Sequence, residues 1–160
     1  MSDRFHVELD KEYLVFSAAH FITFAGNICE RLHGHNYRLR ARITGDLDEN
    51  HYVVDFIALR DALKEIVDEL DHHMLLPTQH PTIRVSEDDK EVVVTFEERR
   101  WVFPRGDCIL LPVANTTAER LAEYIGHRLL DRLERDYQFQ PLHINIGVDE
   151  NFGQWGEWER

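Results

Sequence analysis

The most informative stretch of the chain is Phe16-Ser17-Ala18-Ala19-His20, followed shortly by Cys29-Glu30-Arg31-Leu32-His33-Gly34-His35-Asn36-Tyr37. His33 and His35 are two positions apart, and alternate side chains of a β-strand leave the same face, so both imidazoles can face one point. A strand that ends at His20 could pair antiparallel with a strand that starts near His33 and supply a third imidazole. Three neutral imidazoles around one point are typical of a catalytic zinc site with an open fourth position. The stretch therefore predicts both a strand pair and a metal site.

The ligand types leave some questions about this site open. Zinc suits imidazole best among the common ions, but iron and nickel accept the same ligands. Cys29 could be a fourth ligand that closes a structural site. It could instead be a nucleophile or proton-transfer group beside an open metal, which requires a lowered thiol pKa. Gly34 has no side chain and allows another group to approach the backbone closely.

Length and charge limit the class of protein. With 160 residues the chain is long enough to bury its own core, and we expect a single domain over residues 1–160. Acidic side chains outnumber basic ones by 30 to 18, for a net charge of −12, which disfavours binding to nucleic acid or to an anionic membrane. There is no apolar run of signal-peptide or membrane-spanning length, and Cys29 and Cys108 are too few to staple a secreted domain. We therefore expect a cytoplasmic protein with reduced thiols.

Alternating apolar and polar residues predict strands over residues 5–20, 35–45 and 142–148. Residues 82–104 are expected to add a meander of three short antiparallel strands, separated by charged turns. In the first strand, or pair of strands, the apolar positions are expected to be Phe5, Val7, Leu9, Tyr13, Val15 and Ser17.

Two segments have the apolar spacing of amphipathic helices. The first is expected to begin after an N-cap at Asp55 and to end where Asp71 begins. The second opens at Thr116-Thr117-Ala118-Glu119, which fits a capping box with a Thr at the cap and Glu three residues later. Antiparallel strands with two interposed helices predict a two-layer α+β domain.

Two further positions carry polar groups at the ends of these elements. Asp71-His72 follows the first helix, and a carboxylate beside an imidazole can orient the ring and stabilise its charged form. A His at a helix C-terminus is also favoured by the helix dipole, so this pair alone is weak support for catalysis. Glu150 follows the last strand, and without further information it is a surface carboxylate.

Taken together, the motifs FSAAH (16–20), CERLHGHNY (29–37), LDHH (70–73) and TTAERLAEYI (116–125) resemble the 6-pyruvoyl-tetrahydropterin synthase / 6-carboxy-tetrahydropterin synthase family. The resemblance covers nearly the whole chain. It implies the tunnelling fold (T-fold), an antiparallel β-sheet with two helices packed on one face. It also implies a homo-oligomer, usually a hexamer of two stacked trimers, with active sites at subunit interfaces. The meander at 82–104 is an extra feature relative to compact members of the family.

The resemblance also implies individual roles. Three residues match the zinc ligands, three match the catalytic proton-transfer groups, and two match positions that bind the pterin substrate. In that order they are His20, His33 and His35; Cys29, Asp71 and His72; and Glu150 and Thr117.

The implied activity is the zinc-dependent lyase reaction that converts 7,8-dihydroneopterin triphosphate to 6-carboxy-tetrahydropterin on the route to queuosine and other 7-deazapurines. The 6-pyruvoyl product is an alternative. Glu30 gives the sequence CExxHGH, which resembles variants in which a glutamate supports side-chain cleavage to 6-hydroxymethyl-dihydropterin, a folate precursor. Glu30 is therefore a further possible catalytic residue, besides Cys29, Asp71 and His72. An alternative of another class is a non-catalytic pterin- or purine-binding homologue, which the extra meander motivates.

Overall fold

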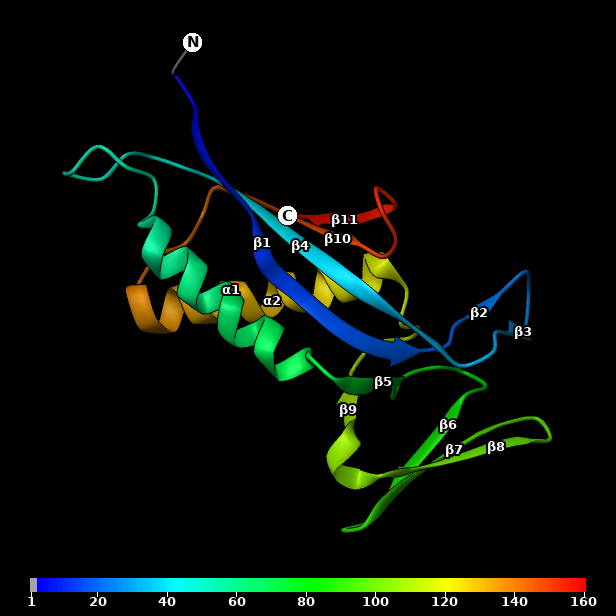
Figure 1. Cartoon of the computed structure of the whole chain (residues 1–160). Coiled ribbons are helices and arrows are strands. Elements are labelled where there is room, and N and C mark those ends of the chain that lie inside the picture. Colours follow the sequence, from blue (N-terminus) through cyan, green and yellow to red (C-terminus); the bar gives the residue numbers. More distant parts are fainter. Residues whose placement is uncertain (1–2) are drawn as a thin grey trace.

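The computed structural model describes residues 3–160 and has one main sheet with two helices on one face (Figure 1). The six strands of this sheet are in the order β11-β10-β4-β1-β5-β9. Helix α1 (Phe56–Leu70) packs on β1, and α2 (Ala118–Tyr137) packs on β10, β11 and α1. This arrangement confirms the α+β prediction with both helices on one face. The strands are β1 (Phe5–His20), β4 (His33–Gly45), β5 (His73–Pro77), β9 (Cys108–Leu111), β10 (His143–Asp149) and β11 (Trp155–Glu159).

A bulge in β1 decides which of its side chains are buried. Asp10 pairs with Arg40 and Val15 pairs with Arg38, so residues 11–14 of β1 face only Leu39 of β4. β1 therefore has three more residues than β4 in this region. Because three is an odd number, the buried side chains change from odd-numbered to even-numbered positions across the bulge. The buried positions after it are Leu14, Phe16, Ala18 and His20. The prediction that Tyr13, Val15 and Ser17 form the apolar side was therefore wrong, because alternation alone does not reveal a bulge.

The antiparallel prediction holds for β1, β4, β10 and β11, but two pairings in the sheet are parallel. β5 pairs parallel with β1, and β9 pairs parallel with β5. A parallel pair needs a crossover connection between its strands. Helix α1 lies in the connection that returns the chain to β5, and residues 78–107 form the connection from β5 to β9. The main sheet is therefore mixed, and strand periodicity does not report either parallel pairing.

The predicted meander is present as a separate three-stranded antiparallel sheet in the connection between β5 and β9. Its strands are β6 (Arg84–Glu87), β7 (Glu91–Phe96) and β8 (Arg99–Pro104), and a short 3₁₀ turn, η1 (Arg105–Asp107), follows. The two-stranded hairpin of β2 (Thr23–Phe24) and β3 (Ile28–Cys29) lies between β1 and β4 in the chain. Figure 1 shows the meander and the hairpin at the same end of the molecule.

The helix ends follow local hydrogen bonding. Asp55 caps α1 as predicted, with its carboxylate accepting a hydrogen bond from the Ile57 backbone N–H at 2.7 Å. The cap of α2 is Thr117, whose hydroxyl accepts from the Arg120 N–H at 3.4 Å. The predicted cap is thus displaced from Thr116 to Thr117, and the predicted capping box was wrong, because the third residue after Thr117 is Arg120. No helix among residues 3–160 is long and apolar enough to cross a membrane.

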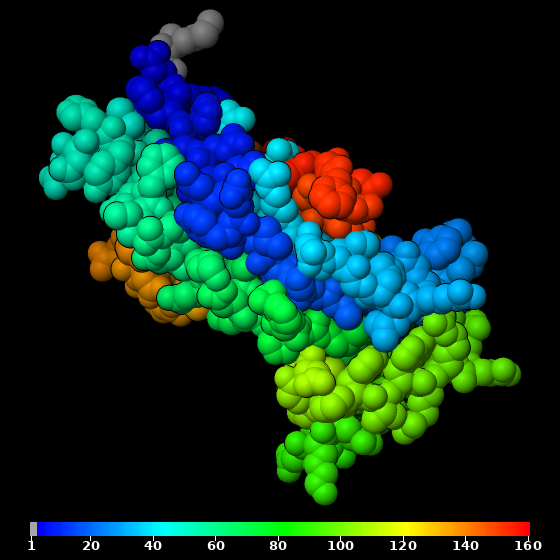
Figure 2. Space-filling model, viewed as in Figure 1, coloured from blue at the N-terminus to red at the C-terminus, as the bar shows by residue number. Residues whose placement is uncertain are grey.

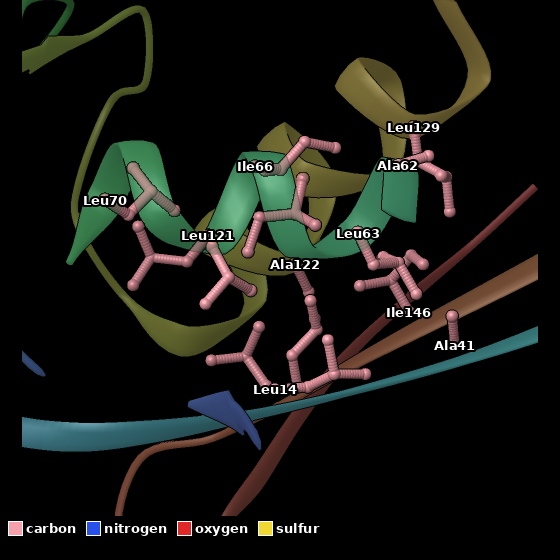
Figure 3. Packing of buried hydrophobic residues seen from close by; sticks show 14 of the residues in the cluster. Leu14, Ala41, Ala62, Leu63, Ile66, Leu70, Leu121, Ala122, Leu129 and Ile146 are labelled. Atoms are coloured by element: carbon pink, nitrogen blue, oxygen red, sulfur yellow. The ribbon is translucent and has the colours of Figure 1, made fainter. Parts of the chain in front are cut away.

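The main core lies between the helices and the sheet. In Figure 3, Leu63, Ile66 and Leu70 of α1 and Leu121 and Leu129 of α2 lie over the strands that carry Leu14, Ala41 and Ile146. A second apolar cluster joins the meander to the sheet. It contains Phe21, Met74, Leu76, Ile83, Val92, Val94, Phe96 and Cys108. The meander is therefore packed as part of the domain.

Gly126 of α2 allows Trp158 of β11 to pack against the helix. A Cβ at Gly126 would lie 2.3 Å from Trp158 Cζ3, closer than packed atoms can approach. We predict that Gly126→Ala lowers the free energy of unfolding by about 1–3 kcal/mol through overpacking. Chemical denaturation measures this change. Gly106→Ala is the matched control, because a Cβ there has no neighbour within 4 Å; equal stability of the two variants would contradict the prediction.

His80 holds the start of the meander against the hairpin. Its Nδ1 accepts from the backbone N–H groups of Thr82 at 3.0 Å and Ile83 at 2.9 Å. Nε2 therefore carries the proton and donates to Thr23 Oγ1 at 2.7 Å. Burial lowers the pKa of His80, and protonation of Nδ1 would remove both backbone contacts.

This depressed pKa predicts a pH-dependent contribution to stability. Because the unfolded chain binds a proton at His80 more readily than the folded chain, the contribution is complete above about pH 6.5 and is lost as the pH falls toward the folded pKa. We expect wild type to lose more free energy of unfolding than His80→Gln between about pH 7 and pH 5. Urea denaturation at each pH, with a chelator present for both proteins, measures the difference. Parallel stability curves would contradict this assignment.

Candidate functional site

The three predicted metal-binding histidines converge at the end of the β1–β4 pair. His20 pairs directly with His33, and His35 pairs with Ala18, so all three rings emerge on the buried face of neighbouring strands. One ring nitrogen from each histidine lies within 4.8 Å of the others. Together they form a group that could hold a metal ion.

Backbone carbonyls orient two of these rings. His20 Nδ1 lies 2.9 Å from the Thr116 carbonyl oxygen, and His33 Nδ1 lies 2.8 Å from the Arg31 carbonyl oxygen. A carbonyl oxygen only accepts, so each Nδ1 carries the proton and each Nε2 has a free lone pair. In metal sites, the ring nitrogen that does not bind the metal commonly donates to such an oxygen, which fixes the ring and leaves the other nitrogen free to bind.

The electrostatics of the site also fit a cation. Burial lowers the pKa of His20 to about 4, which keeps its imidazole neutral at pH 7. His20 Nε2 is buried without a hydrogen-bond partner, yet Glu150 Oε1 lies 3.3 Å from it and 3.6 Å from His35 Nε2. Lone pairs on a neutral imidazole and a carboxylate repel at this distance unless a cation lies near both.

The close neighbour of Gly34 is another strand. A Cβ at this position would lie 3.0 Å from the Ala18 carbonyl oxygen. Gly34 therefore lets β1 and β4 approach each other between the histidines.

Cys29 and Glu30 point in different directions. Cys29 packs against the second apolar cluster, and burial raises the pKa of its thiol, although the nearby charge of Arg99 opposes the shift. Glu30 Oε2 lies 3.9 Å from His33 Nε2 and accepts a hydrogen bond from the Ile22 N–H at 3.2 Å. Of the two neighbouring side chains, the glutamate is directed at the histidines.

Asp71 and His72 form the predicted pair at the end of α1. His72 Nδ1 lies 2.8 Å from Asp71 Oδ2, and the Ser17 N–H donates to Asp71 Oδ1 at 2.7 Å. Partial burial tends to raise the pKa of Asp71, but the hydrogen bonds from Ser17 and His72 prevail and hold it below its ordinary value. Along β1 and β4, Ser17 and Asn36 alternate with the residues of the histidine face, and His72 lines an open depression of about 530 Å³ with them. Within residues 3–160, no hydrogen bond or ion pair joins this pair to the three histidines.

Two residues of the site were not anticipated from sequence. Thr116 is buried, and its carbonyl orients His20, while the neighbouring predicted site residue Thr117 serves as the helix cap. Tyr37 is fully buried, and its ring centroid lies 5.7 Å from that of His20 and 5.4 Å from that of His35. Its position two residues after His35 was the available signal for a third side chain on the histidine face.

Comparison with known proteins now gives this geometry a context. A family model described as 6-pyruvoyl tetrahydropterin synthase matches residues 8–160. The chain belongs to the 6-pyruvoyl tetrahydropterin synthase family. A Methanocaldococcus jannaschii protein named putative 6-carboxy-5,6,7,8-tetrahydropterin synthase is 36% identical over 143 residues, covering 88% of this chain and 86% of the relative. An Aquifex aeolicus protein named 6-carboxy-5,6,7,8-tetrahydropterin synthase is 32% identical over 109 residues, covering 68% of this chain and 60% of the relative.

Solved structures of the pterin synthase family confirm the T-fold. The 6-pyruvoyltetrahydropterin synthase of Plasmodium vivax superposes with a TM-score of 0.90 at 27% identity, covering 99% of both chains. A structure of the same enzyme with a catalytic glutamate replaced by alanine has a TM-score of 0.91 at 25% identity. Because the coverage is nearly complete in both directions, the meander is not an addition peculiar to this chain.

The metal site can be tested by removing ligands. We predict that metal analysis of purified wild type gives a stoichiometric transition-metal content, and that His20→Ala, His33→Ala and His35→Ala each bind much less. The reason is that each variant leaves only two of the three imidazoles. His143→Ala, on the exposed part of β10, is the matched control and should retain the metal. Equal metal content in all variants would show that the cluster is not the binding site.

Proposed function

We propose that this protein is a zinc-dependent lyase that acts on the side chain of 7,8-dihydroneopterin triphosphate. The leading candidate product is 6-carboxy-tetrahydropterin, a precursor of queuosine and other 7-deazapurines. The observation that carries this proposal is the convergence of three imidazole nitrogens within 4.8 Å in a chain of this family. The names of the archaeal and bacterial relatives support the product. The two free cysteines suit a reducing cytoplasm, the location we propose.

Glu150 is the proposed anchor for the pterin ring. A carboxylate can accept two hydrogen bonds from the guanidine-like edge of the amino-pyrimidine. Its oxygen lies 3.3 Å from His20 Nε2, which brings the anchor and the metal-binding nitrogens into one site. Zinc, when bound by the three histidines, would polarise the side-chain oxygens of the substrate as a Lewis acid.

Proton transfer is assigned to Cys29, Glu30 and the Asp71–His72 pair. Glu30 has the more direct position, since its carboxylate lies 3.9 Å from His33 Nε2. The thiol of Cys29 is less ready to act in this conformation, because burial raises its pKa. Asp71 would keep the His72 imidazole oriented and stabilise its charged form during proton transfer.

The position of Glu30 favours a second candidate product, 6-hydroxymethyl-dihydropterin. In that reaction the glutamate would support cleavage of the side chain. The similar Plasmodium vivax 6-pyruvoyltetrahydropterin synthase has a catalytic glutamate, which supports a catalytic role for Glu30 but does not identify the product. Two further alternatives are the 6-pyruvoyl product and a non-catalytic pterin-binding homologue.

We further propose that the active site is completed by another copy of the chain. The support is that, within residues 3–160, no hydrogen bond or ion pair joins Asp71 or His72 to the three histidines of the same chain. A homohexamer of two trimers, as the resemblance implies, would bring a partner's Asp-His pair, and the region of its Thr117, to each metal site. Analytical ultracentrifugation checks this assembly.

The product is identified by incubating the purified, zinc-loaded protein with 7,8-dihydroneopterin triphosphate and analysing the mixture by mass spectrometry. We expect 6-carboxy-tetrahydropterin, accompanied by acetaldehyde and triphosphate. Recovery of 6-hydroxymethyl-dihydropterin would select the second candidate. Unchanged substrate, despite tight pterin binding, would exclude the enzyme and favour the binding homologue.

Substitution of the two neighbouring candidates separates their roles. We expect Glu30→Gln to lower kcat by about 10²–10⁴, the range for loss of a general acid–base group. Cys29→Ser should lower kcat less, because the thiol packs against the meander. Steady-state kinetics at saturating substrate measure both variants. A larger loss for Cys29→Ser would assign proton transfer to the thiol.

A further inference from the structure

The meander contacts the segment that carries Cys29 and Glu30. Figure 2 shows the blue to light-blue atoms of the segment between β1 and β4 next to the yellow-green atoms of the meander. We infer that Arg99 and Trp101 of β8 are positioning residues that determine which of the two side chains, Cys29 or Glu30, faces the metal-binding histidines. This inference rests on the proposed function, in which one of the two transfers the proton.

Arg99 holds the peptide between the two candidates. Its Nη1 donates a hydrogen bond to the Cys29 carbonyl oxygen at 2.9 Å. Its guanidinium carbon lies 4.6 Å from the centre of the Trp101 ring, within the range of a cation–π contact. The planar face of the indole thus supports the guanidinium while the guanidinium binds the carbonyl group.

Trp101 extends this connection to the metal site. Its ring stacks on that of Phe21, with the centroids 4.5 Å apart and the planes at 21°. Phe21 directly follows the metal-binding residue His20 and is buried. The same pair of β8 residues therefore contacts both the residue next to a ligand and the residue next to Glu30.

Other contacts hold the hairpin without selecting between the two side chains. Asn115 donates to the Thr23 carbonyl at 3.1 Å, and the Thr82 hydroxyl donates to Asn27 Oδ1 at 2.9 Å. Ile22 differs from these, because it acts on the same peptide and side chain as Arg99: the Glu30 N–H donates to the Ile22 carbonyl at 2.9 Å, and the Ile22 N–H donates to Glu30 Oε2 at 3.2 Å. Among the contacts of the hairpin in residues 3–160, the one from Arg99 binds the Cys29–Glu30 peptide oxygen itself.

The orientation of one peptide matters because neighbouring side chains of an extended chain point to opposite sides. With the Cys29 carbonyl held by Arg99, Cys29 lies in the apolar cluster and Glu30 lies 3.9 Å from His33 Nε2. A rotation that turned Cys29 toward the histidines would carry its carbonyl away from Arg99. The change would therefore cost a hydrogen bond to a charged group, on the order of tenfold in population.

The first test measures alkylation of Cys29 by iodoacetamide in the metal-loaded, substrate-free protein, with peptide mass spectrometry to follow the rate. We expect Arg99→Gln to raise the rate about tenfold, and Arg99→Lys to remain near wild type because lysine can still donate to the carbonyl. Arg100→Gln is the matched control, since Arg100 is the adjacent, exposed residue on the same strand. The buried Cys108 serves as an internal reference that should react slowly in all variants.

The second test measures kinetics and metal content. A positioning role predicts that Arg99→Gln lowers kcat about tenfold while KM and zinc content stay near wild type. If Arg99→Gln does not fold, Trp101→Phe replaces it; this change keeps a ring against Phe21 but weakens the support for the guanidinium, and should raise the alkylation rate about threefold.

Equal alkylation rates in Arg99→Gln and Arg100→Gln, or in Trp101→Phe and wild type where that variant is used, would overturn the inference. So would a kcat loss accompanied by loss of zinc, because it would indicate general disruption of the site. The alkylation result does not depend on turnover. If wild type leaves the substrate unchanged, the proposed function fails while the positioning of the peptide is still decided.

Discussion

The pairing of β1 with β4 is the constraint on which the site depends. The bulge after Asp10 puts His20 on the same buried face as His33 and His35. Without it, the alternation that buries Leu9 would turn His20 toward the opposite face. Without this one irregularity, the three histidines would not share a face and could not hold a metal ion together. The core between the sheet and the helices stabilises this register, because Leu14 and Phe16 occupy it only when His20 faces inward.

The site is built at the boundary between that core and a polar opening. Burial keeps His20 neutral, and backbone carbonyls hold the Nδ1 protons of His20 and His33, so that Nε2 lone pairs face the centre. The same desolvation raises the pKa of Glu150, whose carboxylate faces these lone pairs. The carboxylate and the imidazole lone pairs repel one another, and a cation between them would remove that repulsion. The groups that would favour an ion here thus come from the ends of several elements: β1, β4, β10 and α2.

Sequence reasoning predicted the features that depend on short-range patterns. The HxH spacing predicted the convergence of His33 and His35, and the apolar spacing predicted both helices and the meander. The inward face of β1 could not be predicted, because Leu14-Val15-Phe16 is apolar at odd and even positions alike and the bulge depends on pairing with β4. The parallel pairing of β5 and β9 depends on crossovers, which periodicity does not report. The opposite orientations of Cys29 and Glu30 depend on Arg99, 70 positions away in the chain.

The meander enters and leaves the domain through neighbouring strands. Met74 pairs with Cys108 and Pro77 pairs with Leu111, so the inserted segment leaves at one end of this parallel pair and returns at the other, and β5 and β9 hold both of its ends in place. A closed connection of this kind can change length at little cost, since each doubling of a loop adds only about 0.6 kcal/mol of closure entropy. Evolution can therefore change the length of this segment with little effect on the sheet that aligns the histidines, provided that the apolar cluster with Phe21, Met74 and Leu76 is kept. The sheet that aligns the three histidines and the segment that contacts Cys29 can therefore diverge at different rates within one fold.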